Sequence, residues 1–314
     1  MAASLLIAFD GSAAAEAAVR AAGALFPGAR ATVLMVHEPA VASVSAFRVG
    51  GGLMPPELVE QNVGELEREL VGEAESAAAE GAKLAGALGL AAEPAVAGGA
   101  RQPWEPILAA AADREADVVV CGSRGRGAVA RSVLGSTSSS LLYHAQRAVL
   151  IVPEAETVPD GPALIAYDGS PAAREGVAAA GRLLPGRPAL VVHAWESPFR
   201  RSAAGRAVSG SPLPEIREVT SDLETLLRET AEATVEEGVE LARVAGLETA
   251  GEAVESGSAA WRVLAATAET RDAAVVVVGS QGHGAVASVL LGSVSAGLVH
   301  HAERPTLIVR ASAP

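Results

Sequence analysis

The sequence predicts an α/β fold with two tandem, doubly wound domains, each a five-stranded parallel sheet with helices on both faces. Its 314 residues suit two domains better than one core. Apolar residues make up 50% of the chain but aromatic residues only 3%, which is typical of Ala-, Val- and Leu-rich helices packed on parallel strands. The chain also repeats itself along almost its whole length. The same elements are therefore expected twice.

Two long segments of the first half return in the second half. The segment LLIAFDGSAAAEAAV at 5–19 matches ALIAYDGSPAAREGV at 163–177. Likewise, VVVCGSRGRGAVARSVLGS at 118–136 matches VVVVGSQGHGAVASVLLGS at 275–293. Pairs at a nearly constant offset complete the match: Asp10/Asp168, Val36/Val192, His37/His193, Trp104/Trp261, Gly122/Gly279 and His144/His301. This spacing indicates domain duplication.

A polar segment, ETVPDGP at 156–162, separates the two copies. It contains two prolines and a glycine between strand-like runs, so it predicts a linker between domains at 1–155 and 160–314. Because the linker is short, the two halves are expected to pack closely.

Short β-branched runs alternate with alanine-rich helical stretches within each half. Runs without polar alternation are typical of strands covered on both faces. The predicted strands are 5–9, 31–37, 93–97, 117–121 and 148–152 in the first half, and 163–167, 189–195, 249–254, 273–278 and 306–309 in the second. Helices are expected at 13–25, 57–88, 103–115 and 133–144, with counterparts in the second copy. Right-handed crossovers then give an open sheet that binds ligands at the carboxyl ends of its strands.

The segments after the two second strands, 38–56 and 196–214, are long and rich in Ser, Gly, Pro and Ala. Loops of this length and composition are often functional. They predict mobile flaps near the carboxyl edge of each sheet.

Charge and cysteine content exclude several classes of protein. The net charge of −13 opposes binding to nucleic acid or to an anionic membrane, which depends on Lys and Arg. Cys121 is the only cysteine, so neither an intramolecular disulfide nor a cysteine metal cluster can form. No apolar run approaches the roughly 18 residues of a membrane span, and no basic region precedes the short apolar stretch at the N-terminus. A cytoplasmic protein without a metal site is expected.

A glycine-rich loop follows the fourth strand of each half. It reads GSRGRG at 122–127, with GST at 135–137 opening a helix, and GSQGHG at 279–284, with GSV at 292–294. Bare backbone N–H groups and a helix N-terminus can both bind phosphate oxygens. The loop contains no lysine and is not a Walker motif; unlike the dinucleotide fingerprint, it does not follow the first strand. It predicts binding of a phosphate-bearing ligand.

The spacing GxxG, nine residues, then G[ST] resembles the ATP-binding signature of the universal stress protein family. It fits Gly122, Gly125 and Gly135-Ser136 in the first half and Gly279, Gly282 and Gly292-Ser293 in the second. The first-strand aspartate followed by Gly-Ser matches too, and the resemblance covers essentially the whole chain. It implies a Rossmann-like, adenine nucleotide α-hydrolase-like fold and a regulatory role in stress response.

The resemblance also implies that ATP, with Mg²⁺ as an optional companion, binds once in each half. Adenine and ribose would lie near the first-strand aspartate and the end of the second strand. Such a carboxylate accepts hydrogen bonds and orients the ligand without acid–base chemistry. The implied residues of the first half are Asp10, Val36, Gly122, Ser123, Arg124, Gly125, Gly127, Gly135, Ser136 and Thr137. Those of the second are Asp168, Val192, Gly279, Ser280, Gly282, Gly284, Gly292, Ser293 and Val294.

The two loops differ in charge. The first carries three arginines, whereas the second has Gln, His and Ser at the same positions: Arg124/Gln281, Arg126/His283 and Arg131/Ser288. Arginine pairs well with phosphate oxygens. We therefore expect the second site to hold a triphosphate more weakly.

Several candidates also have a purely structural explanation. Asp10 and Asp168 could cap the helices that follow them. The other candidates are also expected to be structural. His37 and His193 would be buried at strand ends, and His144 and His301 would suit the dipole at the ends of the last helices. Trp104 and Trp261 would be packing anchors, and Cys121 an inert thiol.

The sequence thus predicts an ATP-binding regulatory protein with little or no turnover and no catalytic residue. An ATP-consuming enzyme of the same fold class is the main alternative; it would need a nucleophile–base pair, metal cluster or loop lysine that the sequence does not reveal. A nucleotide-free interaction module is the other, although intact glycines in both loops argue against it. Family resemblance implies that 147–153 and 304–310 pair as an intrachain pseudo-dimer, and whole chains could form a homodimer.

Overall fold

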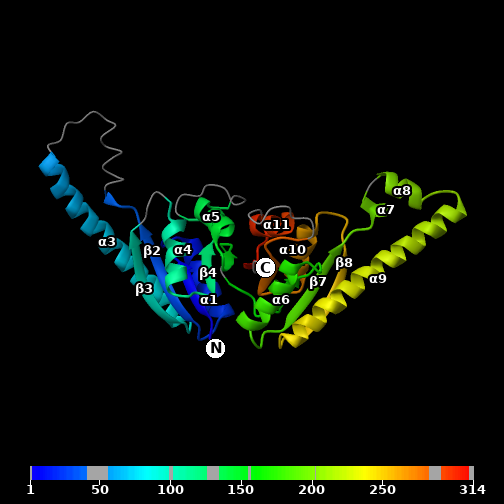
Figure 1. Cartoon of the computed structure of the whole chain (residues 1–314), viewed down its shortest axis with the longest axis horizontal. Coiled ribbons are helices and arrows are strands. Elements are labelled where there is room, and N and C mark those ends of the chain that lie inside the picture. Colours follow the sequence, from blue (N-terminus) through cyan, green and yellow to red (C-terminus); the bar gives the residue numbers. More distant parts are fainter. Residues whose placement is uncertain are drawn as a thin grey trace. The chain divides into compact units, whose positions relative to one another are not determined.

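The computed structural model describes residues 2–40, 56–98, 102–125, 134–154, 157–201, 203–282 and 291–310. The chain divides into two compact units, Met1–Thr157 and Val158–Pro314 (Figure 1). Within the described residues both alternate strands and helices in the same order, and the second unit includes two short helices in a segment whose counterpart lies mostly outside the described residues of the first.

The strands expected from the sequence are all confirmed, with ends shifted by at most two residues. The first unit contains β1 (Ser4–Ala8), α1 (Ala13–Leu25), β2 (Arg30–His37), α3 (Pro56–Ala87), β3 (Ala91–Gly98), α4 (Trp104–Asp113), β4 (Val118–Gly122), α5 (Ser136–His144) and β5 (Ala148–Val152). The second contains β6 (Ala163–Ala166), α6 (Pro171–Leu183), β7 (Ala189–Trp195), α7 (Pro198–Arg201), α8 (Ala203–Ser209), α9 (Pro214–Val244), β8 (Thr249–Glu255), α10 (Ala260–Thr270), β9 (Val275–Gly279), α11 (Ser293–His301) and β10 (Thr306–Val309).

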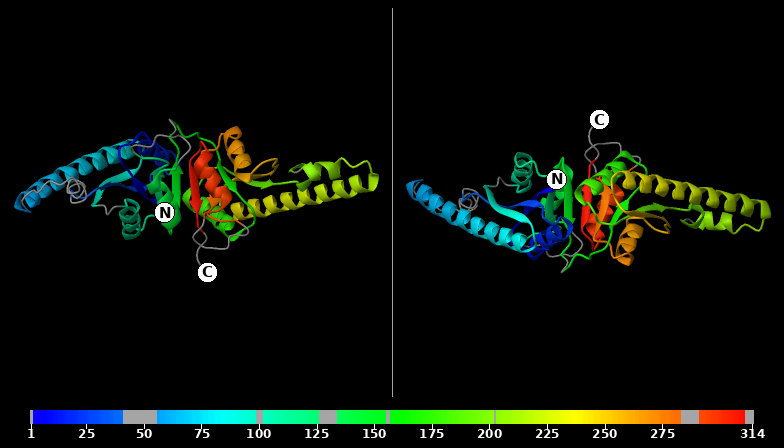
Figure 2. Two further views of the ribbon diagram at one scale, coloured as in Figure 1. Left: turned by 90° about the horizontal axis from the view of Figure 1, so that it is seen from above. Right: turned by 90° about the horizontal axis from the view of Figure 1, so that it is seen from below.

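Each unit has its own run of parallel strands. The order is β3-β2-β1-β4-β5 in the first and β8-β7-β6-β9-β10 in the second. Every residue of β4 and of β9 is buried, as expected of central strands whose residues are almost all apolar. In the first unit α1 packs beside α3, and α4 beside α5. Figure 2 shows α3 and α4 on opposite faces of this sheet.

The strand order reverses between β1 and β4. From β1 the chain moves outward through β2 to β3, then returns to place β4 on the other side of β1. The connections after β1 and β4 therefore leave toward opposite faces and open a crevice at the carboxyl ends of these two strands. The same reversal between β6 and β9 creates a second crevice in the second unit. The fold thus gives each unit one natural ligand site.

The long helix of each unit approaches its sheet closely through a glycine. A Cβ atom on Gly81 of α3 would lie 2.8 Å from Val33 Cγ1 and 3.0 Å from Phe9 Cδ1. On Gly238 of α9 it would lie 2.8 Å from both Tyr167 Cδ1 and a valine methyl group of β7. Both aromatic rings are buried and directly precede the strand-end aspartates. These glycines therefore fix the distance between helix and sheet beside each crevice.

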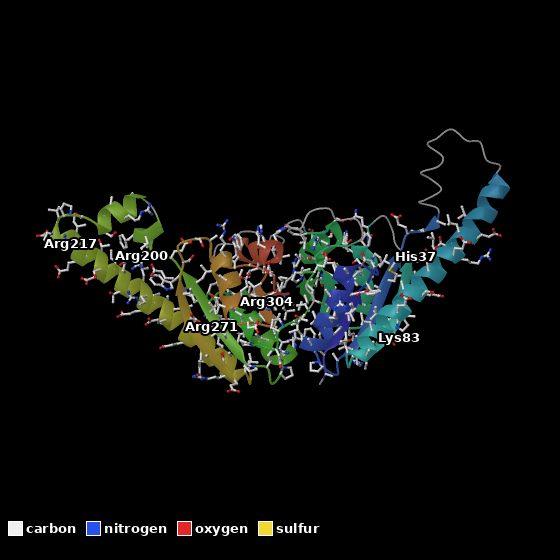
Figure 3. The ribbon with its side chains drawn as sticks, turned by 180° about the vertical axis from the view of Figure 1, so that it is seen from behind. His37, Lys83, Arg200, Arg217, Arg271 and Arg304 are labelled. Carbon is white, nitrogen blue, oxygen red and sulfur yellow. The ribbon has the colours of Figure 1, made fainter. Side chains whose placement is uncertain are left out.

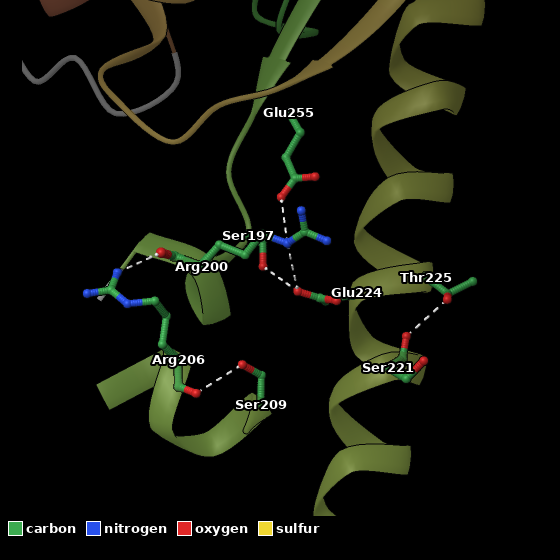
Figure 4. A network of polar contacts seen from close by, with 8 residues as sticks. All are labelled: Ser197, Arg200, Arg206, Ser209, Ser221, Glu224, Thr225 and Glu255. Carbon is green, nitrogen blue, oxygen red and sulfur yellow. Dashed lines mark hydrogen bonds and ion pairs between the residues drawn. The ribbon is translucent and has the colours of Figure 1, made fainter. Parts of the chain in front are cut away.

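The segment after β7, whose composition predicts a mobile flap, contains two short helices, α7 and α8. Arg206 of α8 donates to the Arg200 carbonyl of α7, and the start of the segment makes polar contacts with α9 and β8 (Figure 4). Ser197 Oγ donates to Glu224 Oε1 at 3.0 Å, and Arg200 Nε lies 3.5 Å from Glu224 and 3.2 Å from Glu255. Composition missed these helices because the contacts that fix them come from α9 and β8. Most of the corresponding segment of the first unit, residues 41–55, lies outside the described residues.

None of the helices in the described part of the chain is long and apolar enough to cross a membrane.

We expect Gly81→Ala to destabilise the chain and Gly72→Ala, on the same helix, to stabilise it. The first methyl group would overlap the Phe9 ring and Val33, and such overpacking lowers the free energy of unfolding by about 1–3 kcal/mol. The second meets no atom within 4 Å and gains up to about 1 kcal/mol of helix propensity. Thermal melting of the full chain measures both. Equal shifts for the two variants would contradict close packing at Gly81.

Candidate functional site

Each crevice is a cleft of ligand size. The first has a volume of about 450 Å³ and the second about 540 Å³. The residues predicted from the sequence that line the first are Asp10, Val36, Gly122, Arg124, Gly125, Gly135, Ser136 and Thr137. Those that line the second are Asp168, Val192, Gly279, Gly282, Gly292, Ser293 and Val294. Gly127 and Gly284 lie outside the described residues.

The strand-end aspartates organise the turn into the next helix but are not its caps. Asp10 Oδ1 accepts the Ser12 backbone N–H at 3.0 Å, and Gly11 between them has a φ of +73°. Ser12 is the N-cap of α1, since its Oγ accepts the Ala15 N–H at 3.2 Å. Asp168 and Ser170 repeat this arrangement at 3.0 and 3.2 Å. The capping explanation therefore applies to the serines, and each aspartate lines its cleft.

The second oxygen of each aspartate lies against the glycine loop. A Cβ atom on Gly125 would be 2.8 Å from Asp10 Oδ2, and one on Gly282 would be 2.7 Å from Asp168 Oδ2. A Cβ atom at either position would displace the carboxylate from this place. Glycine as the third loop residue after β4 or β9 thus leaves room for the aspartate that follows β1 or β6.

The first glycine of each loop is required by helix packing. A Cβ atom on Gly122 would lie 2.7 Å from the Ala14 carbonyl oxygen, and one on Gly279 would lie 2.8 Å from that of Ala172. Both contacts are with backbone in the first turn of a helix, which cannot yield easily. Packing alone therefore explains Gly122 and Gly279, so these two glycines do not by themselves argue against a nucleotide-free module.

The serines after these glycines bond through their backbone to the neighbouring strand. The Ser123 N–H donates to the Val152 carbonyl at 2.7 Å, and the Ser280 N–H donates to the Val309 carbonyl at the same distance. Their carbonyls in turn accept the N–H groups of Gly135 and Gly292 at 2.8 Å. The main-chain groups of Ser123 and Ser280 thus join the loop to the neighbouring strand and close its base.

The helix after each loop begins without a side-chain cap. Gly135 and Gly292 are the extended N-cap residues of α5 and α11, and neither can offer a side-chain acceptor to the first helical N–H groups. Ser136 and Thr137 follow at the cleft wall. The next residue, Ser138, donates from Oγ to the Gly122 carbonyl at 2.8 Å and anchors the helix start. This helix end provides backbone donors and partial positive charge, which suit an anion.

The arginine of the first cleft already has a partner. Arg124 Nη2 lies 2.9 Å from Glu154 Oε2, just after β5, and the arginine side chain is only 16% exposed. Gln281 takes the place of Arg124 in the second cleft. The other charge differences between the loops, at Arg126, Arg131, His283 and Ser288, lie outside the described residues.

The strand register corrects one pair of residues matched by sequence. Ala8 pairs with Leu34 and Ala166 pairs with Val192, so Val192 corresponds to Leu34 and not to Val36. The dipeptide Val-His occurs in both second strands but two residues apart in register. Both valines still line their clefts, because a shift of two residues keeps a side chain on the same face.

The same shift separates the two strand-end histidines. His193 corresponds to Met35; its Nδ1 donates to the Tyr167 carbonyl at 2.8 Å, and it lines the second cleft. His37, labelled in Figure 3, lies near α3, with Nδ1 3.7 Å from Glu67 Oε1. His193 is thus a lining residue that the sequence-based site omitted.

Two tryptophan–histidine pairs matched by sequence form ring stacks. Trp104 and His144 stack at 4.3 Å between α4 and α5, and Trp261 and His301 stack at 4.6 Å between α10 and α11. These four rings therefore pack pairs of helices together, in agreement with the structural role expected for them.

Cys121 ends β4 beside the first cleft but is 4% exposed. Burial raises the pKa of its thiol to about 12, despite a hydrogen bond to Ser138 that lowers it. The thiol therefore stays neutral through the physiological range. Val278 occupies the equivalent place in the second unit, which agrees with an apolar packing role.

We expect native protein to resist thiol alkylation at pH 8 and unfolded protein to react once per chain. The raised pKa also makes folding less favourable from about pH 9 upward, since the unfolded thiol ionises while the folded one does not. Mass spectrometry after iodoacetamide treatment, with and without denaturant, measures the reaction. Rapid alkylation of the native chain would contradict burial of the thiol, and Cys121→Val is the control.

Comparisons with known proteins agree with this geometry. A universal stress protein of Mycobacterium tuberculosis is 33% identical over 208 residues, which cover 63% of each chain. One from Thermus aquaticus is 37% identical over 150 residues, 47% of this chain and 96% of the relative. The match therefore spans less than two thirds of the mycobacterial relative. A universal stress protein structure from Archaeoglobus fulgidus has a TM-score of 0.59 at 20% identity and covers 99% of this chain and 100% of that one.

The sequence model of the Universal stress protein family matches twice, at residues 1–153 and 161–310. These two matches contain both clefts, both strand-end aspartates and both glycine loops. The chain belongs to the universal stress protein family, with two such domains in tandem.

Proposed function

We propose that each cleft binds an adenine nucleotide and that the first favours ATP. The observation that supports this most is the meeting, in one cleft, of a carboxylate acceptor and a helix N-terminus. Asp10 lies at one side, and the uncapped start of α5 at Ser136 and Thr137 lies at another. A volume of about 450 Å³ is within the usual range for small-molecule sites, roughly 300–1,000 Å³.

The lining divides naturally among the parts of a nucleotide. Asp10 would accept hydrogen bonds from ribose hydroxyls or the adenine amino group. Val36 and Ile107 offer an apolar wall for the base. The phosphates would meet the donors of α5, whose N-terminal partial charge favours anions. Mg²⁺ would come as a companion of the phosphates, since no group of three His, Cys, Asp or Glu side chains that could hold a metal is found among the described residues.

We propose further that the protein regulates by binding, with little or no turnover. The lining residues offer orientation and anion binding, whereas hydrolysis also needs a group that activates water. The alternatives, an ATP-consuming enzyme and a nucleotide-free module, predict different outcomes in one measurement. Native purification followed by denaturation should release intact ATP; ADP formed over many turnovers would favour the enzyme, and no nucleotide with no thermal shift on adding ATP would favour the module. Cytoplasmic location, the intrachain pseudo-dimer and a homodimer stay predictions.

We expect Asp10→Ala to weaken ATP binding at the first cleft and Asp168→Ala to weaken it at the second, each about tenfold or more. Loss of a hydrogen bond to a charged group costs about 1.5–3 kcal/mol. Isothermal titration of the full chain measures both sites together. Each single variant should leave one binding event unchanged, and the double variant should weaken both. Unchanged titrations in all three variants would overturn the proposed aspartate contact.

We expect Arg124→Gln to weaken ATP binding at the first cleft several-fold while adenosine binding stays unchanged. The reason is loss of a cation that can meet phosphate. Glu154→Gln should do the opposite and strengthen ATP binding, because it removes the competing carboxylate 2.9 Å from Arg124. Parallel titrations with ATP and adenosine, in an Asp168→Ala background, give the comparison. A Glu154→Gln chain with lower ATP affinity would show that the ion pair supports the site instead of competing with it.

A further inference from the structure

Helix α9 carries an exposed apolar stripe that nothing in the nucleotide sites explains. Its members are Ile216, Val219, Leu223 and Leu226, whose exposed fractions are 37%, 58%, 42% and 57%. They are spaced by three, four and three residues, the pattern of a coiled-coil seam. The stripe extends over about 15 Å of helix. Contiguous exposed apolar side chains often mark an interaction site, whereas single scattered ones are ordinary.

Contacts on other sides of α9 fix the rotation of the helix about its axis, so the stripe stays on the solvent-exposed side. Thr220 and Ala231 lie on its buried side. Glu224 is held by Ser197 and Arg200 of the segment that contains α7 (Figure 4). Glu224 directly follows Leu223, so these contacts lie beside the stripe and leave the stripe exposed to solvent.

The fold does not need the two most exposed members of the stripe, as the first unit shows. Gly238 of α9 corresponds to Gly81 of α3, since both pack on the aromatic ring at the end of the first strand. At the same offset, Val219 corresponds to Asn62 and Leu226 to Glu69, whereas Ile216 and Leu223 correspond to apolar residues. The long helix of the first unit thus has polar residues in place of Val219 and Leu226. The four-residue stripe is complete only in the second unit.

Charges beside the stripe indicate what could cover it. Acidic residues recur every seven residues beside the stripe, beginning just before Ile216: Glu215, Asp222 and Glu229. With Ile216 and Leu223 at one seam position, these acids line one flank of the seam, and Thr220 and Leu227 line the other. A second copy of α9 packed antiparallel would oppose acid to acid at the acidic flank. Arg217 (labelled in Figure 3) and Arg228 are not in this row, and Arg243, which continues it, lies beyond the stripe. A helix with Lys or Arg at its flanks would be attracted instead, and an anionic membrane would be repelled.

We propose that the α9 stripe docks an amphipathic helix of another protein, with apolar residues at three- and four-residue spacing and basic residues at the flank that faces Glu215, Asp222 and Glu229. Apolar contact along the seam supplies the affinity, and the acidic row fixes the choice and orientation of the partner. This surface lies on α9, so its occupation is separate from the proposed nucleotide contacts at Asp168 and Ser293.

A designed peptide tests the proposal on the full chain. The probe is a helix of about three heptads with Leu at both seam positions and Lys at both flanks, and the matched peptide has Glu at the flanks. Fluorescence anisotropy should show micromolar binding of the Lys peptide and at least tenfold weaker binding of the Glu peptide. Val219→Ser with Leu226→Ser should weaken Lys-peptide binding at least tenfold, although the net charge of the protein is unchanged.

Two controls keep the result interpretable. Val244→Ser changes an apolar side chain that is 78% exposed at the far end of the same helix, and it should leave binding unchanged. Val219→Asn with Leu226→Glu copies the residues of α3 and gives a second disruption if the serine variant melts early. Equal binding of both peptides, or no loss in either double variant, would overturn the proposal. A chain dimer in sedimentation velocity that the serine variant dissociates would overturn it in favour of a second copy.

Discussion

The site of each unit depends on one close backbone contact. Gly122, at the end of β4, lies so near the carbonyl of Ala14 that no side chain fits between them. This contact holds the first turn of α1 against the strand that carries the loop. As a result Asp10, in the turn just before α1, reaches the loop at Gly125. Remove the contact, and the carboxylate and the loop would no longer form one cleft. The second unit has the same contact between Gly279 and Ala172.

Much of this arrangement could be predicted from the sequence, because it rests on local patterns. Buried parallel strands read as unbroken apolar runs, and duplication doubled the evidence for each of them. The aspartates and the glycine loops were identified correctly as neighbours, since strand ends meet at one edge of a parallel sheet.

The errors come from features that depend on distant parts of the chain. Register between β6 and β7 shows that Val192 matches Leu34, which a shared Val-His dipeptide concealed. The helices after β7 are stabilised by Glu224 and Glu255, both far along the sequence. The pairing of Arg124 with Glu154 joins residues thirty positions apart. The packing role of Gly122 and Gly279 was also missed, because only coordinates show that a helix backbone fills their side-chain space.

The short helix after each loop connects the cleft to an aromatic pair. Helix α5 begins at Ser136 beside the first cleft and ends at His144, whose ring stacks on Trp104 at 4.3 Å. At nine residues it is about 13 Å long, so a short helix separates the aromatic pair from the cleft. The second unit repeats the connection through α11, where Trp261 and His301 stack at 4.6 Å. An indole ring, the natural fluorophore of proteins, is thus joined to each cleft by one short helix.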